Sequence, residues 1–326
     1  MHILETHWQR PTLLSTLLLP LSGLYCAMSG TRRFAYRHGW CRPERFSVPV
    51  IVVGNITVGG TGKTPLVLWL AAFLRNAGFR PGIVTRGYGG RAKQWPCLVQ
   101  SDSDPDEAGD EPVLLARRSG APVAAGPDRA AAGRLLMGSH RCDVLLSDDG
   151  LQHYRLARDI EIAVIDGARR VDDGRWLPAG PLREPVSRLK SVDLRVTNGA
   201  PAAGELSMTL VPCGFRELIS GRVEAQLPAA GGPWHAVAGI GHPARFFGQL
   251  RAMGLDIIEH AFPDHHRFCP QDLAFGHEAG VLMTEKDAVK CERFARPGWW
   301  AVTVEARPDE RLGTAILKLL KEKACG

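Results

Sequence analysis

The chain has 326 residues, of which 45% are hydrophobic and 23% are charged, and its formal net charge is +6. This composition is ordinary for a globular protein and excludes a fibrous or disordered chain, while the length favours two α/β domains over one. The eight cysteines are scattered, with no C-x-x-C pair and no metal-ligand spacing, which favours free thiols in a reducing compartment over disulfides or a zinc site.

The first fifty residues hold six arginines and two glutamates, and these arginines flank an uncharged apolar stretch at 11–31. They are not interleaved with aromatic residues, so an anionic membrane surface is favoured over nucleic acid as the partner. Leucines at helical spacing in the stretch form one apolar stripe. Pro20 and several polar residues make it a poor candidate for a membrane-spanning helix.

We therefore expect residues 1–40 to form an amphipathic element that lies in a membrane interface. Arg32, Arg33 and Arg37 would then lie at phospholipid headgroups. The alternative is that the apolar stripe packs on the protein's own core, because a stripe alone does not distinguish lipid from protein.

A β-branched run at 50–53 leads into a glycine-rich turn that ends in Gly62, Lys63 and Thr64. Such a run suits a strand buried in a parallel sheet, and the glycines let backbone N–H groups surround phosphate oxygens at the start of the next helix. Lys63 would reach the β- and γ-phosphates, and Thr64 would bind Mg²⁺. Thr57 replaces the usual first glycine, so an ordinary strand-turn-helix is the alternative. The predicted nucleotide-binding residues are Thr57, Val58, Gly59, Gly60, Thr61, Gly62, Lys63 and Thr64.

After a helix at 63–77 and a strand at 82–85, the loop at 86–90 falls at the carboxyl end of a strand, where ligands bind in doubly wound sheets. Arg86 and Tyr88 there are either substrate contacts or ordinary turn residues. Asp110 and Glu111 begin the next predicted helix. Their charges either complement the helix dipole or face the phosphate loop and act on a hydroxyl group.

A second strong signal is the apolar strand at 142–147, which ends in Asp148 and Asp149. In phosphate-loop enzymes a carboxylate at such a strand end holds Mg²⁺ beside the Lys-Thr helix, and we assign this role to Asp148. A simple Asp-Asp-Gly turn is the alternative. A further strand at 160–165, a proline- and glycine-rich loop at 175–185, and a helix and strand within 187–197 would complete the first sheet.

The predicted architecture is an α/β phosphate-loop NTPase-like parallel sheet domain with a second, smaller α/β domain. The boundaries are 1–40 for the amphipathic element, 41–200 for the phosphate-loop core, 201–230 for a linker or β-ribbon, and 231–326 for the smaller domain. Strands at 205–210 and 221–227 would form the ribbon. The smaller domain would contain strands at 234–240, 256–261, 281–284 and 299–304, with helices at 243–253 and 309–323.

Seven segments together resemble the tetraacyldisaccharide 4'-kinase family. They are Val-Gly-Asn-Ile-Thr-Val-Gly-Gly-Thr-Gly-Lys-Thr-Pro at 53–65, Thr-Arg-Gly-Tyr-Gly-Gly at 85–90, Gly-Asp-Glu-Pro at 109–112, Asp-Asp-Gly-Leu-Gln-His at 148–153, Leu-Pro-Ala-Gly-Pro-Leu-Arg-Glu at 177–184, Phe-Pro-Asp-His-His at 262–266 and Thr-Glu-Lys-Asp at 284–287. The resemblance spans nearly the whole chain, and the unusual Thr57 is the family's own form.

The resemblance implies transfer of the γ-phosphoryl group of ATP to the 4'-hydroxyl of a tetraacylated glucosamine disaccharide 1-phosphate, which forms the lipid A precursor lipid IVA. It implies ATP and Mg²⁺ as cofactors, the lipid A disaccharide precursor as partner, and the cytoplasmic face of the bacterial inner membrane as location. We further expect a monomer. The alternative functions are a membrane-associated phosphate-loop ATPase with a regulatory or assembly role, and a membrane-bound binding module.

The resemblance also pairs Asp110 with His265 as the base for the sugar hydroxyl, an arrangement that chemistry favours because a histidine holds a proton better than a carboxylate near neutral pH. Lys63 is the third predicted catalytic residue. The predicted metal ligands are Thr64, Asp148 and Glu111.

In the segment at 284–287, lysine and aspartate are adjacent, so a guanine-binding spacing fails and adenine is expected. The predicted substrate contacts are Arg86, Tyr88, Asp149, Gln152, His153 and Arg183.

Overall fold

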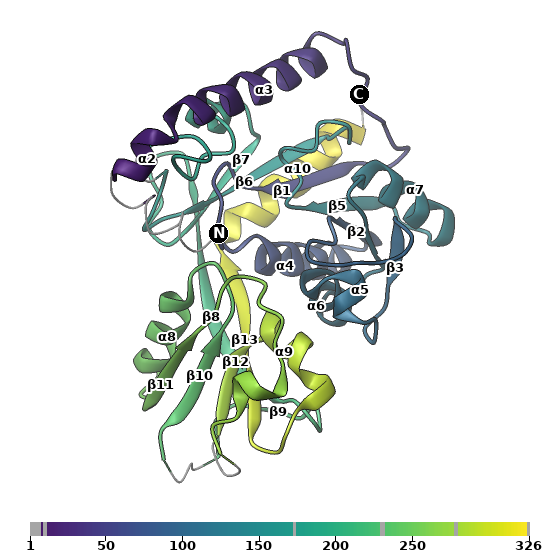
Figure 1. The fold of residues 1–326 in the computed structure, drawn as a ribbon. Coiled ribbons are helices and arrows are strands. Elements are labelled where there is room, and N and C mark those ends of the chain that lie inside the picture. The colour runs from purple at the N-terminus through teal and green to yellow at the C-terminus, as the bar shows by residue number, and fades with distance from the viewer. Residues whose placement is uncertain (1–7, 9–11, 172–173, 229–231, 277–279, 325–326) are drawn as a thin grey trace.

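The computed structural model describes residues 8, 12–171, 174–228, 232–276 and 280–324 (Figure 1). The strands are β1 (Val50–Gly54), β2 (Pro81–Thr85), β3 (Cys97–Val99), β4 (Val123–Ala125), β5 (Val144–Asp148), β6 (Ile160–Asp166), β7 (Leu194–Asn198), β8 (Leu206–Glu217), β9 (Val223–Glu224), β10 (Trp234–Ala238), β11 (Ile257–Ala261), β12 (Val281–Thr284) and β13 (Trp299–Pro308). The helices are α2 (Leu13–Leu17), α3 (Leu19–Arg37), α4 (Lys63–Asn76), α5 (Pro105–Ala108), α6 (Asp110–Ser119), α7 (Arg129–Ser139), α8 (Pro243–Ala252), α9 (Glu285–Cys291) and α10 (Glu310–Ala324), with short 3-10 helices at Val186–Lys190, Pro270–Leu273 and Glu292–Phe294.

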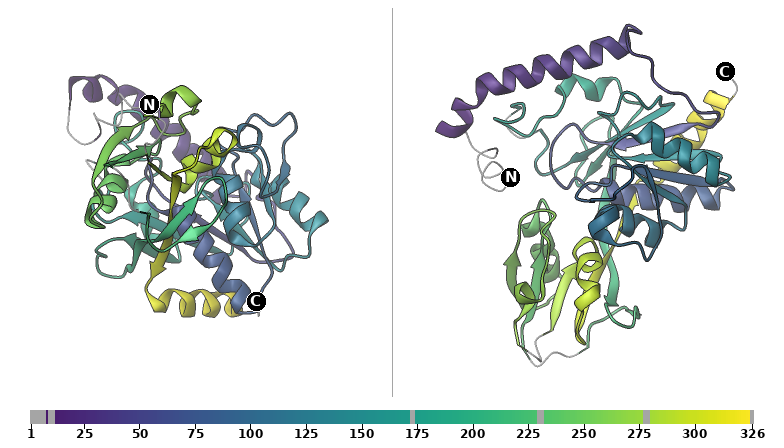
Figure 2. Two further views of the ribbon diagram at one scale, coloured as in Figure 1. Left: turned by 90° about the horizontal axis from the view of Figure 1, so that it is seen from below. Right: turned by 45° about the vertical axis from the view of Figure 1, so that its right-hand side comes forward.

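All the strands belong to one continuous sheet in the order β11-β10-β12-β13-β8-β7-β6-β1-β5-β2-β4-β3, with β9 paired to β8. Strands β2, β5, β1, β6 and β7 run parallel, so their carboxyl ends meet at one edge. This edge carries the ligand in doubly wound sheets. The predicted fold class is confirmed: a parallel phosphate-loop sheet forms the first lobe, and β10, β11, β12 and α8 form the centre of a smaller α/β lobe (Figures 1 and 2).

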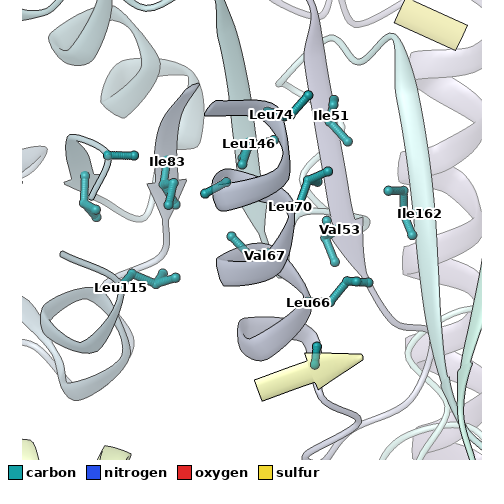
Figure 3. Packing of buried hydrophobic residues seen from close by; sticks show 14 of the residues in the cluster. Ile51, Val53, Leu66, Val67, Leu70, Leu74, Ile83, Leu115, Leu146 and Ile162 are labelled. Carbon is teal, nitrogen blue, oxygen red and sulfur yellow. The ribbon is translucent and has the colours of Figure 1, made fainter. Parts of the chain in front are cut away.

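Helix α4 packs on one face of the first lobe because its apolar residues recur at helical spacing. Leu66, Val67, Leu70 and Leu74 point at β1 and β5, where Ile51, Val53 and Leu146 are fully buried (Figure 3). The contact fixes the first turn of α4, and therefore Lys63 and Thr64, against the carboxyl ends of the strands. Because this cluster is closely packed, it gives the phosphate loop a rigid support.

Two long strands connect the lobes, and this differs from the predicted ribbon. The ribbon was expected between 205–210 and 221–227, but β8 extends to Glu217 and pairs antiparallel with β13 along its length, while β9 has only two residues. The strand that pairs with β8 along its length is β13, about ninety residues further along the chain. The local pattern of 201–230 therefore did not reveal this pairing.

The carboxyl-terminal helix α10 also lies in an unexpected place. We predicted it within the smaller domain, but Leu312, Ile316 and Leu320 join the same buried cluster as α4. Strand β13 carries the chain back from the smaller lobe to the first (Figure 1). The phosphate-loop core is therefore built from both ends of the sequence, and a single boundary at 231 does not describe it.

Helices α2 and α3 lie along the outside of the first lobe, on the side remote from the smaller lobe (Figures 1 and 2). The break between them falls at Leu18, and Pro20 sits in the first turn of α3, where its missing N–H costs nothing. Pro20 thus begins a helix and does not interrupt one. Among the described helices, none combines the length and apolarity needed to cross a bilayer.

Candidate active site

The phosphate loop runs from Gly54, at the end of β1, to Lys63, at the start of α4. Gly59 and Gly62 adopt positive φ values of 112° and 96°, which non-glycine residues rarely adopt. The loop is braced from outside, because Val58 donates its backbone N–H to Pro181 and the Gln152 amide donates to the carbonyl of Asn55. The proline-rich loop at 177–184 is therefore the wall of the phosphate loop.

Two acidic residues at the end of β5 meet the first residues of α4. The hydroxyl of Thr64 donates to Asp148 Oδ2 at 3.1 Å, and the ammonium group of Lys63 lies 3.6 Å from Asp149 Oδ1. Because β1 and β5 are adjacent parallel strands, the end of one strand and the helix after the other converge at the same edge. The structure thus brings together the predicted Lys-Thr pair and the predicted Asp-Asp pair.

The surroundings of Asp148 suit a carboxylate that binds a cation. Its side chain is buried, and burial together with the negative charge of Glu111 raises its pKa to about 7. Its Oδ1 atom has no hydrogen-bond partner among the described residues. One hydroxyl, one orphaned carboxylate oxygen and nucleotide phosphates are the donor set that Mg²⁺ takes in such sites. The described residues contain no preformed group of three His, Cys, Asp or Glu ligands.

Asp149 is held in a different state from its neighbour. Burial would raise the pKa of its carboxyl group, but Lys63 and Arg183 outweigh burial and hold that pKa well below its usual range. Arg183 Nη1 donates to both carboxylate oxygens at 2.9 Å, and Arg129 donates to the Asp149 carbonyl at 3.0 Å. Asp149 also has a positive φ of 49°, a conformation concentrated at functional sites.

Arg129 is a site residue that the sequence did not indicate. Its side chain is buried, and burial lowers the pKa of its guanidinium to about 10 despite the nearby charge of Asp149. Its only signal is its position after Asp128, the N-cap of α7, because that cap fixes where the helix begins.

The two lobes meet where Asp110, the first residue of α6, contacts His265 of the smaller lobe. His265 Nδ1 lies 3.1 Å from Asp110 Oδ2 and 3.2 Å from Oδ1, and its φ is 58°. Burial alone would raise the pKa of Asp110, but the charge of Lys286, the hydrogen bond from His265 and the charge of Lys290 hold it well below its usual range. The carboxylate is therefore ionised and able to orient the imidazole.

Lys286, from the Thr-Glu-Lys-Asp segment, holds this region together. Its ammonium group lies 3.1 Å from each of Glu111 Oε1, Asp264 Oδ1 and His265 Nε2. An ammonium group only donates, so Nε2 accepts and the imidazole proton lies on Nδ1, toward Asp110. The sequence singled out this segment without giving Lys286 a role. The available signal was the position of this lysine in Thr-Glu-Lys-Asp, one of the segments that carry the family resemblance.

The smaller lobe also closes on the phosphate loop. A Cβ atom on Gly241 would lie 3.3 Å from the backbone nitrogen of Gly60 and 3.4 Å from Asp264 Oδ2, so loop, Gly241 and Asp264 are neighbours. In addition, Arg245 of α8 donates to Asp166 at the end of β6 at 2.6 Å. These contacts place the Asp110–His265 pair on the same side of the sheet as the phosphate loop.

The remaining predicted residues have varied surroundings. Glu111 faces Lys286 and acts electrostatically on Asp148. Tyr88 packs against His265 with ring centroids 4.5 Å apart and the ring planes tilted by 50°, and Arg86 is exposed and lies over Tyr88. His153 lies against the start of α7, where its Nε2 accepts from the backbone of Arg129; burial and the charge of Arg129 lower its pKa to about 4.

Comparison with known proteins identifies the family. The sequence model described as Tetraacyldisaccharide-1-P 4'-kinase matches residues 14–321. The Tetraacyldisaccharide 4'-kinase of Nitrosococcus oceani is 53% identical over 308 residues, which are 94% of this chain and 91% of that protein. The protein of the same name from Aeromonas hydrophila is 51% identical over 323 residues, which are 97% of this chain and 96% of that protein.

A solved structure agrees with the sequence relatives. The crystal structure of the Aquifex aeolicus protein LpxK, described as an "apo" form in complex with ATP, superposes with a TM-score of 0.79 at 28% identity. The match covers 94% of this chain and 100% of that one. By sequence model, by close relatives over almost their full length and by fold, the chain belongs to the tetraacyldisaccharide 4'-kinase family.

Proposed function

We propose that this chain binds ATP and transfers its γ-phosphoryl group to the 4'-hydroxyl of a tetraacyldisaccharide 1-phosphate, forming lipid IVA. The observation that carries the proposal is the assembly of two chemistries on one side of the sheet. Lys63 and Thr64 open a phosphate-binding helix beside Asp148, and the smaller lobe brings His265 to Asp110 next to it. The relatives' shared name gives the acceptor, and the ATP in the Aquifex aeolicus complex gives the donor.

In this proposal the predicted nucleotide-binding residues surround the phosphates through backbone N–H groups, and Lys63 stabilises charge on the transferring group. Thr64 and Asp148 would hold Mg²⁺, with Glu111 as a further carboxylate nearby. The ion would neutralise charge on the β- and γ-phosphates. Asp110 fixes the orientation of His265, and the pair accepts the proton of the sugar hydroxyl.

The contacts support a role in substrate recognition for the predicted residues around Asp149. Arg183 and Arg86 supply positive charge for an anionic acceptor, and Tyr88 supplies a ring face beside His265. Gln152 and His153 brace the loop and the start of α7, so their contribution to binding would be through position.

We further propose that α2 and α3 hold the protein on the cytoplasmic face of the inner membrane. Leu13 is 87% exposed, Leu17 76% and Leu24 59%, so the apolar stripe is largely free of protein contacts. The buried side of α3 binds the core through Ser22, which donates to the carbonyl of Trp176 and accepts from the backbone of Ala179. The helix therefore packs on the core through its polar side, and its apolar stripe faces outward, which supports the membrane interface over the alternative that the stripe packs on the core.

The decisive test is phosphate transfer from γ-labelled ATP to a tetraacyldisaccharide 1-phosphate in neutral detergent micelles. We expect a labelled lipid product from the wild type and none from Lys63→Met. Release of inorganic phosphate without a labelled lipid would support the alternative of a regulatory or assembly ATPase. Absence of both activities in a folded, ATP-binding protein would leave only a binding module and overturn the proposal.

Membrane association is tested by sedimentation with phospholipid vesicles. Leu17→Ser with Leu24→Ser should weaken binding by about 100-fold or more, because each buried leucine contributes about 1.5–3 kcal/mol. The matched control is Ile219→Ser with Val223→Ser, which removes two apolar side chains of similar exposure from the smaller lobe. Equal loss in both variants would contradict an interface at α2 and α3.

A further inference from the structure

A cavity of about 600 Å³ lies between the last turns of α3 and the kinase core. None of its lining residues belongs to the phosphate loop or to the Asp110–His265 pair. Six of them are basic and one is acidic. The basic residues are Arg33, Arg37, Arg45, Arg158, Arg188 and Lys190, and the acidic residue is Glu161. The cavity therefore has a large excess of positive charge.

The inner part of the cavity is fixed by ion pairs. Arg158 Nη1 lies 3.0 Å from Glu161 Oε1, and Arg188 pairs with the same oxygen. Arg188 also donates to Ser191, and Arg158 donates to several backbone carbonyls. Arg188 Nε also lies 3.8 Å from Glu184 Oε2, behind the cavity wall. The Glu161 carboxylate thus orients both guanidinium groups at the floor of the cavity.

The outer part of the cavity has a different character. Within the described residues, Arg33, Arg37, Arg45 and Lys190 have no carboxylate or hydrogen-bond partner for their side chains. Arg37, Arg45 and Lys190 are exposed. Unpaired cations that surround a fixed basic floor are arranged for an anion with several oxygen atoms.

Two aromatic rings form one wall and join α3 to the core. Tyr36 stacks on Tyr154 with ring centroids 5.9 Å apart, and the Arg158 guanidinium lies 5.2 Å from the Tyr154 ring centroid. The Tyr154 hydroxyl in turn donates to Glu184, which is buried. The ligand would therefore meet apolar ring faces as well as charge, which suits an amphiphile better than a small inorganic ion.

The position along α3 favours a membrane lipid over the acceptor sugar. The proline- and glycine-rich loop at 175–185 contacts α3 at Ser22 and Tyr25, whereas the cavity begins at Arg33 and includes Tyr36. Eleven residues separate Tyr25 from Tyr36, which corresponds to about 16 Å along the helix axis. The cavity therefore lies further along α3 than the contact at Ser22, although Tyr154 in its wall bonds to Glu184 of the same loop. It is lined by the end of a helix whose leucines are exposed.

We propose that this cavity is a binding site for the phosphate headgroup of an anionic glycerophospholipid, which locks the end of α3 to the core at the membrane surface. The inference rests on the proposed membrane association of α2 and α3, and does not depend on the kinase reaction. It assigns a separate task to each part of the helix. The leucine stripe gives general affinity for bilayers, and the cavity gives preference for anionic lipid.

The test uses the full chain and vesicles of phosphatidylcholine with or without phosphatidylglycerol. Arg37→Gln with Lys190→Gln should weaken binding to phosphatidylglycerol vesicles about tenfold to thirtyfold, from about 1 kcal/mol per basic residue, and leave binding to pure phosphatidylcholine unchanged. The matched control, Arg296→Gln with Lys321→Gln, removes two exposed charges elsewhere and should change binding less than twofold.

A second variant separates the cavity from diffuse surface charge. Ser187→Trp would fill the cavity from an exposed position without changing charge, and should also remove the preference for phosphatidylglycerol. Retained preference in Ser187→Trp, or equal loss in the charge control, would overturn the proposal. The proposal would also be overturned if Arg37→Gln with Lys190→Gln kept the wild-type preference for phosphatidylglycerol but raised the KM for the acceptor in neutral micelles. That result would place the acceptor 1-phosphate in the cavity. Absence of wild-type binding to either vesicle would instead contradict the membrane association itself.

Discussion

His265 Nδ1 lies 3.1 Å from Asp110 Oδ2, across the contact between the two lobes. Asp110 comes from the start of α6 in the kinase core, and His265 follows β11 in the smaller lobe. Because Nε2 accepts from Lys286, the imidazole proton lies on Nδ1 and points toward the carboxylate. We infer that Nε2 becomes the proton acceptor when the sugar hydroxyl takes the place of the ammonium group.

This relationship predicts a specific loss in Asp110→Asn. The amide cannot stabilise an imidazolium group, so kcat should fall about 10²- to 10⁴-fold, as for a lost general base. ATP affinity, measured by equilibrium titration, should change little, because Asp110 does not belong to the phosphate loop. Wild-type turnover in this variant would exclude Asp110 from proton transfer.

Lys286 should act as a positioning residue. Burial raises the pKa of Asp110 and Lys286 provides the largest opposing effect, so Lys286→Met should raise that pKa and shift the acidic limb of the kcat/KM profile to higher pH. The control is Lys318→Met, which removes a lysine that is 77% exposed on α10. An unshifted profile with reduced activity would indicate a purely structural role.

The comparison of sequence and structure separates local signals from long-range ones. The strand-turn-helix at 50–65 was predictable because apolar strand, glycine turn and Lys-Thr are contiguous, and Asp148 was predictable because it ends a buried strand. Pairing of Asp110 with His265 came from family resemblance, since no local pattern joins residues 155 positions apart.

Other features were beyond the sequence for physical reasons. The partner of β8 and the return of α10 to the core depend on the crossing by β13, a nonlocal pairing. Arg129 reaches Asp149 only because α7 begins beside the end of β5. A buried arginine resembles a surface arginine in sequence, because its burial is decided by neighbours from other elements.

Asp149→Asn should reduce stability in a pH-dependent way. Lys63 and Arg183 outweigh burial and depress the pKa of Asp149, so its contribution is present above about pH 4, the unfolded value, and is lost as pH falls through the folded pKa. The Tm of the wild type should therefore fall more steeply below pH 4 than the Tm of the variant. At pH 7 the variant should have the lower Tm. Parallel curves would show that the ion pairs contribute nothing net.

Asp148→Asn should have the opposite effect on the nucleotide-free protein. The folded pKa of Asp148 is raised to about 7 by burial and Glu111, whereas the unfolded value is about 4, so the unfolded state loses its proton first and stability falls between about pH 4 and 7. The neutral amide escapes this loss, so the Tm of the variant should exceed that of the wild type by several degrees at pH 8.

The same substitution should abolish the response to magnesium. Mg²⁺ with ATP should raise the wild-type Tm at pH 8, because the ion favours the ionised carboxylate of Asp148 and binds only the folded state. Asp148→Asn should show a much smaller rise and little phosphate transfer despite its greater stability. A matched control, Asp143→Asn, removes a partly exposed carboxylate before the same strand and should retain the full response. A normal magnesium response in Asp148→Asn would move the metal to another carboxylate, with Glu111 the next to test.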